Sequence, residues 1–320
     1  MSAGPQTDLH TTHTISTPPR ILLLGADGQL GWELRRALLP LGDVKPLNRT
    51  QADLCNLPAL RAVLDQARPH IIVNAAAYTA VDRAESEPEL AQRINAAAPG
   101  LLAAWAAEHD AMLVHYSTDY VFDGSKPAPY TELDAPKPRS VYGHSKRAGE
   151  QAIAQSGCRH LIFRTSWVYA ARGGNFAKTM LKLAREREHL RVVADQFGAP
   201  TSAELIADVT ALALHRVQTD ASFATAIGTW SGLYHLTACC STSWHGYAQF
   251  VLQQAAAHGV ALRCGAEAVE PIATADYPLP APRPANSRLD CDRLQAALGL
   301  ALPHWQIQVR RMLAEVAVQG

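Results

Sequence analysis

The sequence predicts an α/β fold of the doubly wound type: a parallel sheet with helices on both faces, followed by a smaller discontinuous C-terminal domain. Short apolar runs such as residues 21–24 and 111–115 alternate with amphipathic helical stretches, as expected for buried parallel strands. Three glycines, Gly25, Gly28 and Gly31, follow the first run. The chain of 320 residues, 48% of them hydrophobic, is long enough to bury the core of such a sheet.

The composition is typical of a globular enzyme that binds neither nucleic acid nor a membrane. The charged fraction of 18% fits a globular enzyme, and the formal net charge of +0 predicts neither a nucleic-acid nor an anionic-membrane partner. No apolar run reaches the ~18 residues of a membrane span, so no membrane association is expected. Residues 1–19 are polar and are expected to form a disordered tail. The six cysteines show no CxxC spacing, which predicts reduced thiols and a cytoplasmic location.

The glycine-rich turn predicts a dinucleotide site. A strand over residues 20–24 leads into Gly25-x-x-Gly28-x-x-Gly31 and then into an amphipathic helix. Glycines let the backbone turn sharply and approach a pyrophosphate, whose charge the N–H groups of the following helix can hold. A tight turn without a ligand is the alternative, but the order of strand, glycines and helix favours a Rossmann-type NAD(P)-binding domain over residues 20–165.

The end of the second predicted strand, residues 44–47, bears on the choice of cofactor. It should face the adenosine ribose, where NAD selectivity usually requires an acid. Here Asn48 removes the charge that would repel a 2′-phosphate, and Arg49 adds a donor that can meet a phosphate at two points. Arg49 in water, with dual cofactor use, is the alternative. We expect NADPH to serve at least as well as NADH, with Asp53 and Leu54 bordering the adenine.

Tyr142 and Lys146 lie one helical turn apart and predict acid–base chemistry. An ammonium beside a phenol should lower the tyrosine pKa from about 10 toward the working pH. An ordinary surface helix gives the same spacing, but Ser117 and Thr118 end a predicted strand at the edge where ligands of parallel sheets bind. Thr118 can donate a hydrogen bond to a carbonyl oxygen while Tyr142 delivers the proton.

The glycine turn, Ser117-Thr118 and Tyr142-x-x-x-Lys146 together resemble the extended short-chain dehydrogenase/reductase superfamily. Longer blocks, spread over about residues 21 to 313, are similar to the dTDP-4-dehydrorhamnose reductase family. These blocks are NAAAYTAVD at 74–82, HYSTDYVF at 115–122, FRTSWVY at 163–169, NFAKTM at 175–180, DQFGAPT at 195–201 and RPANSR at 283–288.

The resemblance implies reduction of the C4 ketone of dTDP-4-dehydro-L-rhamnose by NAD(P)H. This is the last step to dTDP-L-rhamnose, which serves bacterial surface polysaccharides such as the O-antigen of lipopolysaccharide. It implies Tyr142 as proton donor, Lys146 as its modulator and a ligand of the nicotinamide ribose, and Thr118 as the third catalytic hydroxyl. The implied substrate contacts are Thr118, Asp119, Tyr142 and Trp167. The implied cofactor contacts are Gly28, Gln29, Leu30, Asn48, Asp53, Leu54, Ala77, Tyr78, Thr79, Tyr116 and Lys146.

The remaining expectations concern the substrate half, residues 166–200 and 231–284, with segments near 201–230 and 285–320 returning to the first domain. Trp167 follows a strand end, where it can act as a sugar or base platform or can simply be core. Arg283 and Arg288 flank a proline-dense stretch and can hold a diphosphate bidentately; solvated surface arginines are the alternative.

Three glutamates bear on how the chain associates. In some members of the resembled family, glutamates meet around Mg²⁺ at a dimer contact, and Glu33, Glu204 and Glu315 stand at the corresponding places. Clustered carboxylates repel one another unless a hard cation joins them, which favours Mg²⁺ and a homodimer. The alternative is three solvated surface acids.

The rival functions are another nucleotide-sugar epimerase or 4,6-dehydratase of the superfamily, or a catalytically silent regulatory subunit. Intact Thr118, Tyr142 and Lys146 argue against the silent subunit.

Overall fold

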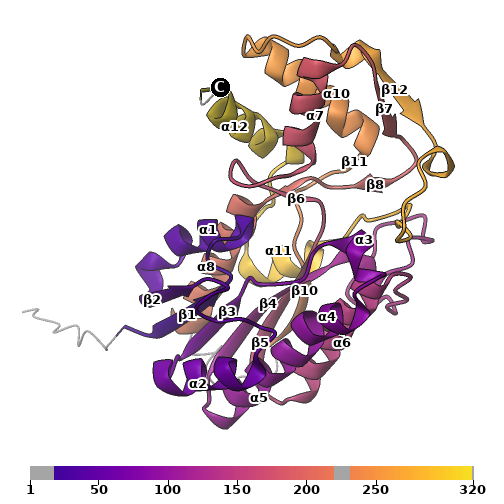
Figure 1. The fold of residues 1–320 in the computed structure, drawn as a ribbon. Helices are drawn as coiled ribbons and strands as arrows, with labels where there is room; N and C mark the ends of the chain where they lie inside the picture. Colours follow the sequence, from indigo (N-terminus) through magenta and orange to yellow (C-terminus); the bar gives the residue numbers. More distant parts are fainter. Residues whose placement is uncertain (1–17, 220–230, 319–320) are drawn as a thin grey trace, which may run out of the picture.

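The computed structural model describes residues 18–219 and 231–318; the tail expected over residues 1–19 therefore lies outside the description except for its last two residues. Six strands form one sheet in the order β10-β5-β4-β3-β1-β2, and every neighbouring pair is parallel (Figure 1). The predicted doubly wound α/β fold is confirmed. The strands are β1 (Arg20–Leu24), β2 (Asp43–Leu47), β3 (Ile71–Asn74), β4 (Met112–Thr118), β5 (Arg159–Thr165) and β10 (Gly232–His235).

Both faces of the sheet are covered, which explains why its strands are apolar throughout. Every residue of β3 and β4 is buried. Successive side chains of a strand point to opposite faces, so Ile21 and Leu23 of β1 enter one apolar cluster and Leu22 and Leu24 enter another. The helices that pack around the sheet are α1 (Gln29–Ala37), α2 (Leu57–Ala67), α5 (Ala98–Glu108), α6 (Val141–Gln155), α8 (Ala203–Thr219) and α11 (Asp292–Leu298).

Helix α6 is fixed where its first turn meets the end of β4. Its N-cap is Ser140, whose hydroxyl accepts a hydrogen bond from the Gly143 amide at 3.1 Å. A Cβ at Gly143 would lie 2.3 Å from the Tyr120 carbonyl oxygen, so only glycine allows this approach. The close contact brings the beginning of α6 against residues 118–120. Short elements α3 (Val81–Ala84), α4 (Pro88–Gln92) and a π-helical turn (Arg93–Ala97) pack beside α6.

The remaining elements gather on one side of the sheet (Figure 1). Three pairs of short strands and three helices form this part of the molecule. The strand pairs are β7 (Leu190–Val193) with β12 (Val269–Ile272), β8 (Phe197–Gly198) with β11 (Thr242–Ser243), and β6 (Val168–Tyr169) with β9 (Thr201–Ser202). The helices are α7 (Phe176–Glu186), α10 (Trp244–Ala257) and α12 (Trp305–Val318).

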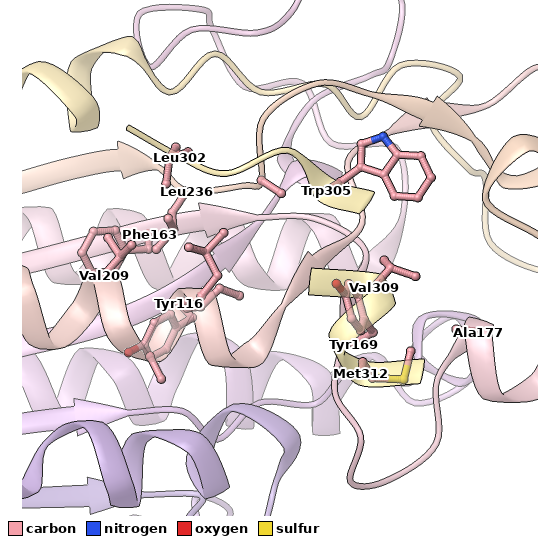
Figure 2. Close-up of a cluster of buried hydrophobic side chains, with 14 of the residues drawn as sticks. Tyr116, Phe163, Tyr169, Ala177, Val209, Leu236, Leu302, Trp305, Val309 and Met312 are labelled. Atoms are coloured by element: carbon pink, nitrogen blue, oxygen red, sulfur yellow. The ribbon is translucent and has the colours of Figure 1, made fainter. Parts of the chain in front are cut away.

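The apolar core runs without a break from the sheet into these elements. Figure 2 shows the cluster passing from Tyr116 and Phe163 of the sheet to Trp305, Val309 and Met312 on α12. This shared core holds the two parts of the molecule together beside the carboxyl ends of the strands. Among the residues that the structure describes, no helix has the length and apolarity needed to cross a membrane.

Candidate active site

A crevice is expected beside β1, where the order of the strands in the sheet changes direction. β1 has β2 on one side and β3 on the other, and ligands of open parallel sheets bind beyond the carboxyl ends of the strands at such a point. A cavity of about 650 Å³ lies there, lined by the β1–α1 turn, the ends of β3, β4 and β5, and helix α6. A second hollow of about 680 Å³, beside residues 55–58 and 89–97, is more open and is lined by no tyrosine, lysine or histidine.

The β1–α1 turn has the shape that a pyrophosphate requires. Gly25 has a φ of +78°, in the left-handed region, and a Cβ there would lie 2.7 Å from the Ala76 amide nitrogen. A Cβ at Gly31 would lie 2.0 Å from the Gly25 carbonyl oxygen, so Gly31 serves the packing of α1 on the turn. Gly28 is the N-cap of helix α1, which has no side-chain cap and no acid in its first turn. Its N–H groups suit an anion, and the turn therefore fits a dinucleotide.

The end of β2 places one of the predicted cofactor contacts outside the cavity lining. Arg49, Asp53 and Leu54 line the cavity, but Asn48 does not. The Asn48 Oδ1 atom accepts hydrogen bonds from the Thr50 amide at 3.1 Å and the Thr50 hydroxyl at 2.8 Å, so the side chain closes its own turn. The expected contact between Asn48 and the ribose is therefore not supported. The Arg49 side chain is 78% exposed, and its ion pair with Asp53 is long, at 3.9 Å. The guanidinium can therefore turn to a phosphate in the cavity.

Thr118 and Tyr142 lie together at the cavity wall. The Thr118 hydroxyl donates to Asp119 Oδ1 at 3.1 Å and accepts from the Tyr120 amide, while the Tyr142 ring packs edge-on against Tyr120. Burial raises the pKa of Tyr142 to about 12. A hydrogen bond with Thr118 lowers this pKa, and the charge of Asp119 raises it. The expectation that an ammonium lowers this pKa is therefore wrong.

The position of Lys146 explains why the pKa of Tyr142 is not lowered, because the amino group of Lys146 contacts β4. The side chain is 1% exposed, and Nζ donates to the Tyr116 carbonyl oxygen at 2.6 Å and lies 3.1 Å from His115 Nε2. Burial lowers the pKa of Lys146 to about 8, against the opposing influence of the Glu150 carboxylate. The side chain still lines the cavity that Tyr142 faces.

The predicted substrate contacts Thr118, Asp119, Tyr142 and Trp167 all line this cavity. Burial raises the pKa of Asp119 to about 6, although hydrogen bonds from Ser287 and Thr118 oppose the shift. Its Oδ2 atom is buried and has no hydrogen-bond partner among the described residues. The Trp167 ring stacks on Trp244 with centroids 3.5 Å apart, so one face is packed while the residue also borders the cavity.

Arg283 and Arg288 do not line the cavity. Arg283 Nη2 lies 2.7 Å from Asp82 Oδ2, and Arg288 donates to the Pro127 carbonyl oxygen at 2.5 Å and to Asn286 Oδ1 at 2.8 Å. Both guanidinium groups are thus engaged by protein acceptors. The expected diphosphate contact finds no support in this arrangement, because proline-dense residues 271–284 direct Arg283 to helix α3 instead.

The three glutamates expected at a metal face arginines. Glu33 lies 3.9 Å from Arg36, and Arg311 lies 2.8 Å from Glu204 and 3.6 Å from Glu315. Burial and then the nearby Glu204 raise the pKa of Glu33, so the acids are close enough to repel one another. Over residues 18–219 and 231–318, no three His, Cys, Asp or Glu side chains are placed to hold a metal. The arginines replace Mg²⁺ as the neutralising charge, and the magnesium prediction is not supported.

Most of the other predicted cofactor contacts do meet at the cavity. The predicted residues that line it are Gly25, Gly28, Gln29, Leu30, Arg49, Asp53, Leu54, Ala77, Tyr78, Thr79, Tyr116, Tyr142 and Lys146. The sequence reasoning missed Tyr120, Thr165 and Ser166 at its wall, and the buried polar groups His115 and Glu150 behind it. Glu150 follows Lys146 by four residues, so the helical repeat carried a signal for it.

Comparison with known proteins agrees with this geometry. The family model described as the RmlD substrate binding domain matches residues 19–318. The chain belongs to the RmlD family. The dTDP-4-dehydrorhamnose reductase of Shigella flexneri is 49% identical to it over 300 residues, which cover 92% of this chain and 97% of that relative.

Solved structures of related proteins are similar to this chain over most of its length. A dTDP-4-dehydrorhamnose reductase from Bacillus anthracis, in complex with NADP, has a TM-score of 0.83 and 35% identity, over 93% of this chain and 100% of that one. The UDP-glucose 4-epimerase of Thermus thermophilus, in complex with NAD, has a TM-score of 0.75 at 19% identity, over 93% and 98% of the two chains. The second likeness shows a shared fold alone.

Proposed function

We propose that Thr118, Tyr142 and Lys146 form the catalytic group of an NAD(P)H-dependent dTDP-4-dehydrorhamnose reductase. The enzyme reduces the C4 ketone of dTDP-4-dehydro-L-rhamnose, and the product is dTDP-L-rhamnose. The observation that carries the assignment is that these three side chains line one cavity with the glycine turn of a chain belonging to the RmlD family. A dinucleotide fits the turn because the first N–H groups of α1 have no side-chain cap and no acid beside them, which leaves them to a pyrophosphate.

The chain's own groups supply the proton and the binding geometry. The bound cofactor supplies the hydride that reaches the ketone carbon. With a pKa of about 12, Tyr142 is a phenol at neutral pH and therefore still carries the proton that the ketone oxygen needs. The Thr118 hydroxyl can turn from Asp119 to donate a hydrogen bond to the same oxygen as negative charge develops. The buried floor of the cavity limits the water that would compete for these bonds.

Arg49 supports a preference for NADPH. It stands at the end of β2 and lines the cavity, and its exposed ion pair with Asp53 is long, at 3.9 Å, so the guanidinium can turn to a 2′-phosphate. The Bacillus anthracis relative was crystallised with NADP. We expect NADPH to serve at least as well as NADH. The nucleotide-sugar lies at the other end of the cavity, with Trp167 and Asp119 as contacts.

The same proposal divides the chain into two domains. We place residues 20–165, with return segments near 201–230 and 285–320, in the cofactor-binding domain, and residues 166–200 and 231–284 in the domain that binds the sugar nucleotide. Two elements depart from these bounds: β10 (Gly232–His235) is a strand of the main sheet, and α12 (Trp305–Val318) packs against α10. Part of the first return segment, residues 220–230, lies outside the described residues. A cytoplasmic location is consistent with six free cysteines. The product serves a surface polysaccharide such as lipopolysaccharide, and a homodimer is the expected assembly.

The main rival is an epimerase or dehydratase of the same fold. Such enzymes regenerate their cofactor in each cycle and retain it, whereas a reductase must exchange it. The test is to purify the protein, denature it and measure the released nucleotide, with the purified protein then assayed for NADPH oxidation. Little bound NAD together with stoichiometric NADPH consumption supports the reductase. Stoichiometric bound NAD without NADPH consumption would support the rival.

A further inference from the structure

Two adjacent cysteines lie on the surface, outside the active-site cavity. Cys239 and Cys240 follow β10 and precede β11, and both side chains are exposed. Their Sγ atoms lie 3.3 Å apart, and one thiol donates a hydrogen bond to the other. Neither residue lines the cavity that Thr118 and Tyr142 share. The pair therefore offers two nucleophilic groups that the proposed reaction does not use.

The backbone brings the two sulfur atoms to the same side of the chain. Successive side chains of an extended segment point in opposite directions, which would keep neighbouring sulfur atoms apart. Cys240 instead has a φ of +70°, in the left-handed region that a residue with a side chain seldom adopts. The Cys239 amide donates to the Pro303 carbonyl oxygen at 2.8 Å, and its carbonyl oxygen accepts from the Trp305 amide at 3.1 Å. These bonds fix the chain at the first of the two thiols.

A disulfide does not suit two adjacent residues. Consecutive Cα atoms across a trans peptide are about 3.8 Å apart, whereas disulfides usually join Cα atoms about 4.4–6.8 Å apart. A bond between Cys239 and Cys240 would therefore be strained and easily reduced. The hydrogen bond with Cys239, followed by burial, raises the pKa of the Cys240 thiol. Both observations favour a pair that persists as two thiols.

The distance between the sulfur atoms selects among the soft centres that thiols bind. For a centre about 2.3 Å from each sulfur, as in a zinc–thiolate bond, the 3.3 Å separation gives a sulfur–centre–sulfur angle of about 90°. A tetrahedral zinc would hold the sulfur atoms about 3.8 Å apart, and a linear ion about 4.6 Å apart. Over residues 18–219 and 231–318, no three His, Cys, Asp or Glu side chains are placed to hold a metal, which also argues against zinc.

We propose that Cys239 and Cys240 form a binding site for trivalent arsenicals, in which one arsenic atom joins both sulfur atoms. Trivalent arsenic is soft and pyramidal because it keeps a lone pair, so its bond angles are close to the angle that this pair offers. An arsenoxide loses its As=O bond and forms two As–S bonds, and the two thiol protons leave with the oxygen as water. Arsenic and sulfur keep their oxidation states, so the step needs no oxidant or reductant.

The other four cysteines do not offer such a pair. Cys158, Cys264 and Cys291 are buried. Cys55 is half-buried beside an open hollow whose lining contains no second cysteine. An arsenical on a single thiol is displaced by a competing monothiol, whereas attachment at two points makes the second bond intramolecular and strengthens binding. The structure therefore predicts one firmly bound arsenical per chain.

The test uses phenylarsine oxide with the folded, full-length protein. After treatment with excess 2-mercaptoethanol, the wild-type mass should show one phenylarsenic group gained and two hydrogens lost; the dithiol 2,3-dimercaptopropanol should remove the group. At a fixed excess of 2-mercaptoethanol, Cys239→Ser and Cys240→Ser should each raise the phenylarsine oxide concentration for half labelling by ~10²–10⁴-fold, the usual gain from a second attachment.

Cys55→Ser is the matched control and should label as the wild type does. Serine at an exposed position leaves the core intact, and equal unfolding temperatures of the variants check this. Three results would each overturn the proposal: a wild-type protein that retains no label, wild-type retention in either Cys239→Ser or Cys240→Ser, and loss of the label in Cys55→Ser. The readout is a mass and not turnover, so the outcome is independent of the proposed reductase activity.

Discussion

Arg164 and Glu150 form a two-point ion pair beneath the active-site cavity, with Nε–Oε1 at 2.8 Å and Nη2–Oε2 at 2.7 Å. Both side chains are at most 2% exposed. The carboxylate also accepts from the Ser117 hydroxyl at 2.6 Å and from Arg147 at 2.9 Å. One acid therefore joins β4, β5 and α6, the three elements that carry Thr118, Thr165 and Tyr142.

Glu150→Ala should destabilise the fold by ~3–5 kcal/mol, because it leaves the Arg164 charge buried without its partner. Chemical denaturation measures the change in the free energy of unfolding. Glu108→Ala is the control: Glu108 pairs with Arg61 at 2.7 Å, but the two side chains are 51% and 39% exposed. It should cost at most about 1 kcal/mol. Equal losses in the two variants would show that burial does not set the strength of the Arg164 pair.

Tyr142→Phe should remove the proton donor and preserve the cavity. Loss of a general acid lowers rates by ~10²–10⁴-fold, so kcat should fall by that range while the Kd for NADPH stays nearly constant. Rapid kinetics and cofactor titration of the variant measure the two quantities. Wild-type turnover in this variant would remove Tyr142 from the mechanism.

The elements that place this tyrosine were predictable from local sequence. The apolar runs that became β1, β3 and β4 are short and sharply bounded, and the glycine turn identifies the first strand–helix unit. The role proposed for Tyr142 rests on its spacing to Lys146, which is visible in the sequence. The direction of Lys146 did not follow, because it depends on His115 and Tyr116 of β4, which meet α6 only in the folded chain.

Arg49→Ala should lower kcat/KM for NADPH and leave kcat/KM for NADH nearly unchanged. The reason is that only NADPH carries the phosphate that the guanidinium is placed to meet. A charge-assisted contact of this kind contributes ~1.5–3 kcal/mol, which corresponds to a loss of about 10–150-fold. Steady-state kinetics with both cofactors in both proteins measure the effect. Equal losses for the two cofactors would show that Arg49 does not read the phosphate.

Asp119→Asn should stabilise the protein at pH 8 more than at pH 4. The folded pKa of about 6 lies above the ordinary value of 3.8, so the stability linked to this acid is fully present below the ordinary value and is lost as pH rises through 6. An amide does not titrate and avoids that loss, which amounts to roughly 1.4 kcal/mol per pKa unit. Thermal unfolding of both proteins across this pH range gives the difference. A gain that is the same at pH 4 and pH 8 would be inconsistent with a raised pKa.

Three predicted ligand contacts that the structure gives no support share a physical cause. Asn48, Arg283 and Glu204 were assigned ligands from their positions along the chain, yet each has a protein partner instead: Thr50, Asp82 and Arg311 respectively. The first partner is local, and turn chemistry at Asn48 was a readable alternative. The other two partners are 201 and 107 residues away in the chain, and only the fold reveals them.

The most direct test of the proposed function is NADPH oxidation with dTDP-4-dehydro-L-rhamnose, followed at 340 nm, with the product identified by mass spectrometry. The proposed function predicts one equivalent of NADPH consumed per dTDP-L-rhamnose formed, and no consumption with dTDP-glucose, which has no ketone. Tyr142→Phe should show a loss of ~10²–10⁴-fold in the same assay. Absence of NADPH oxidation by the folded wild-type protein, with authentic substrate present, would contradict the central claim.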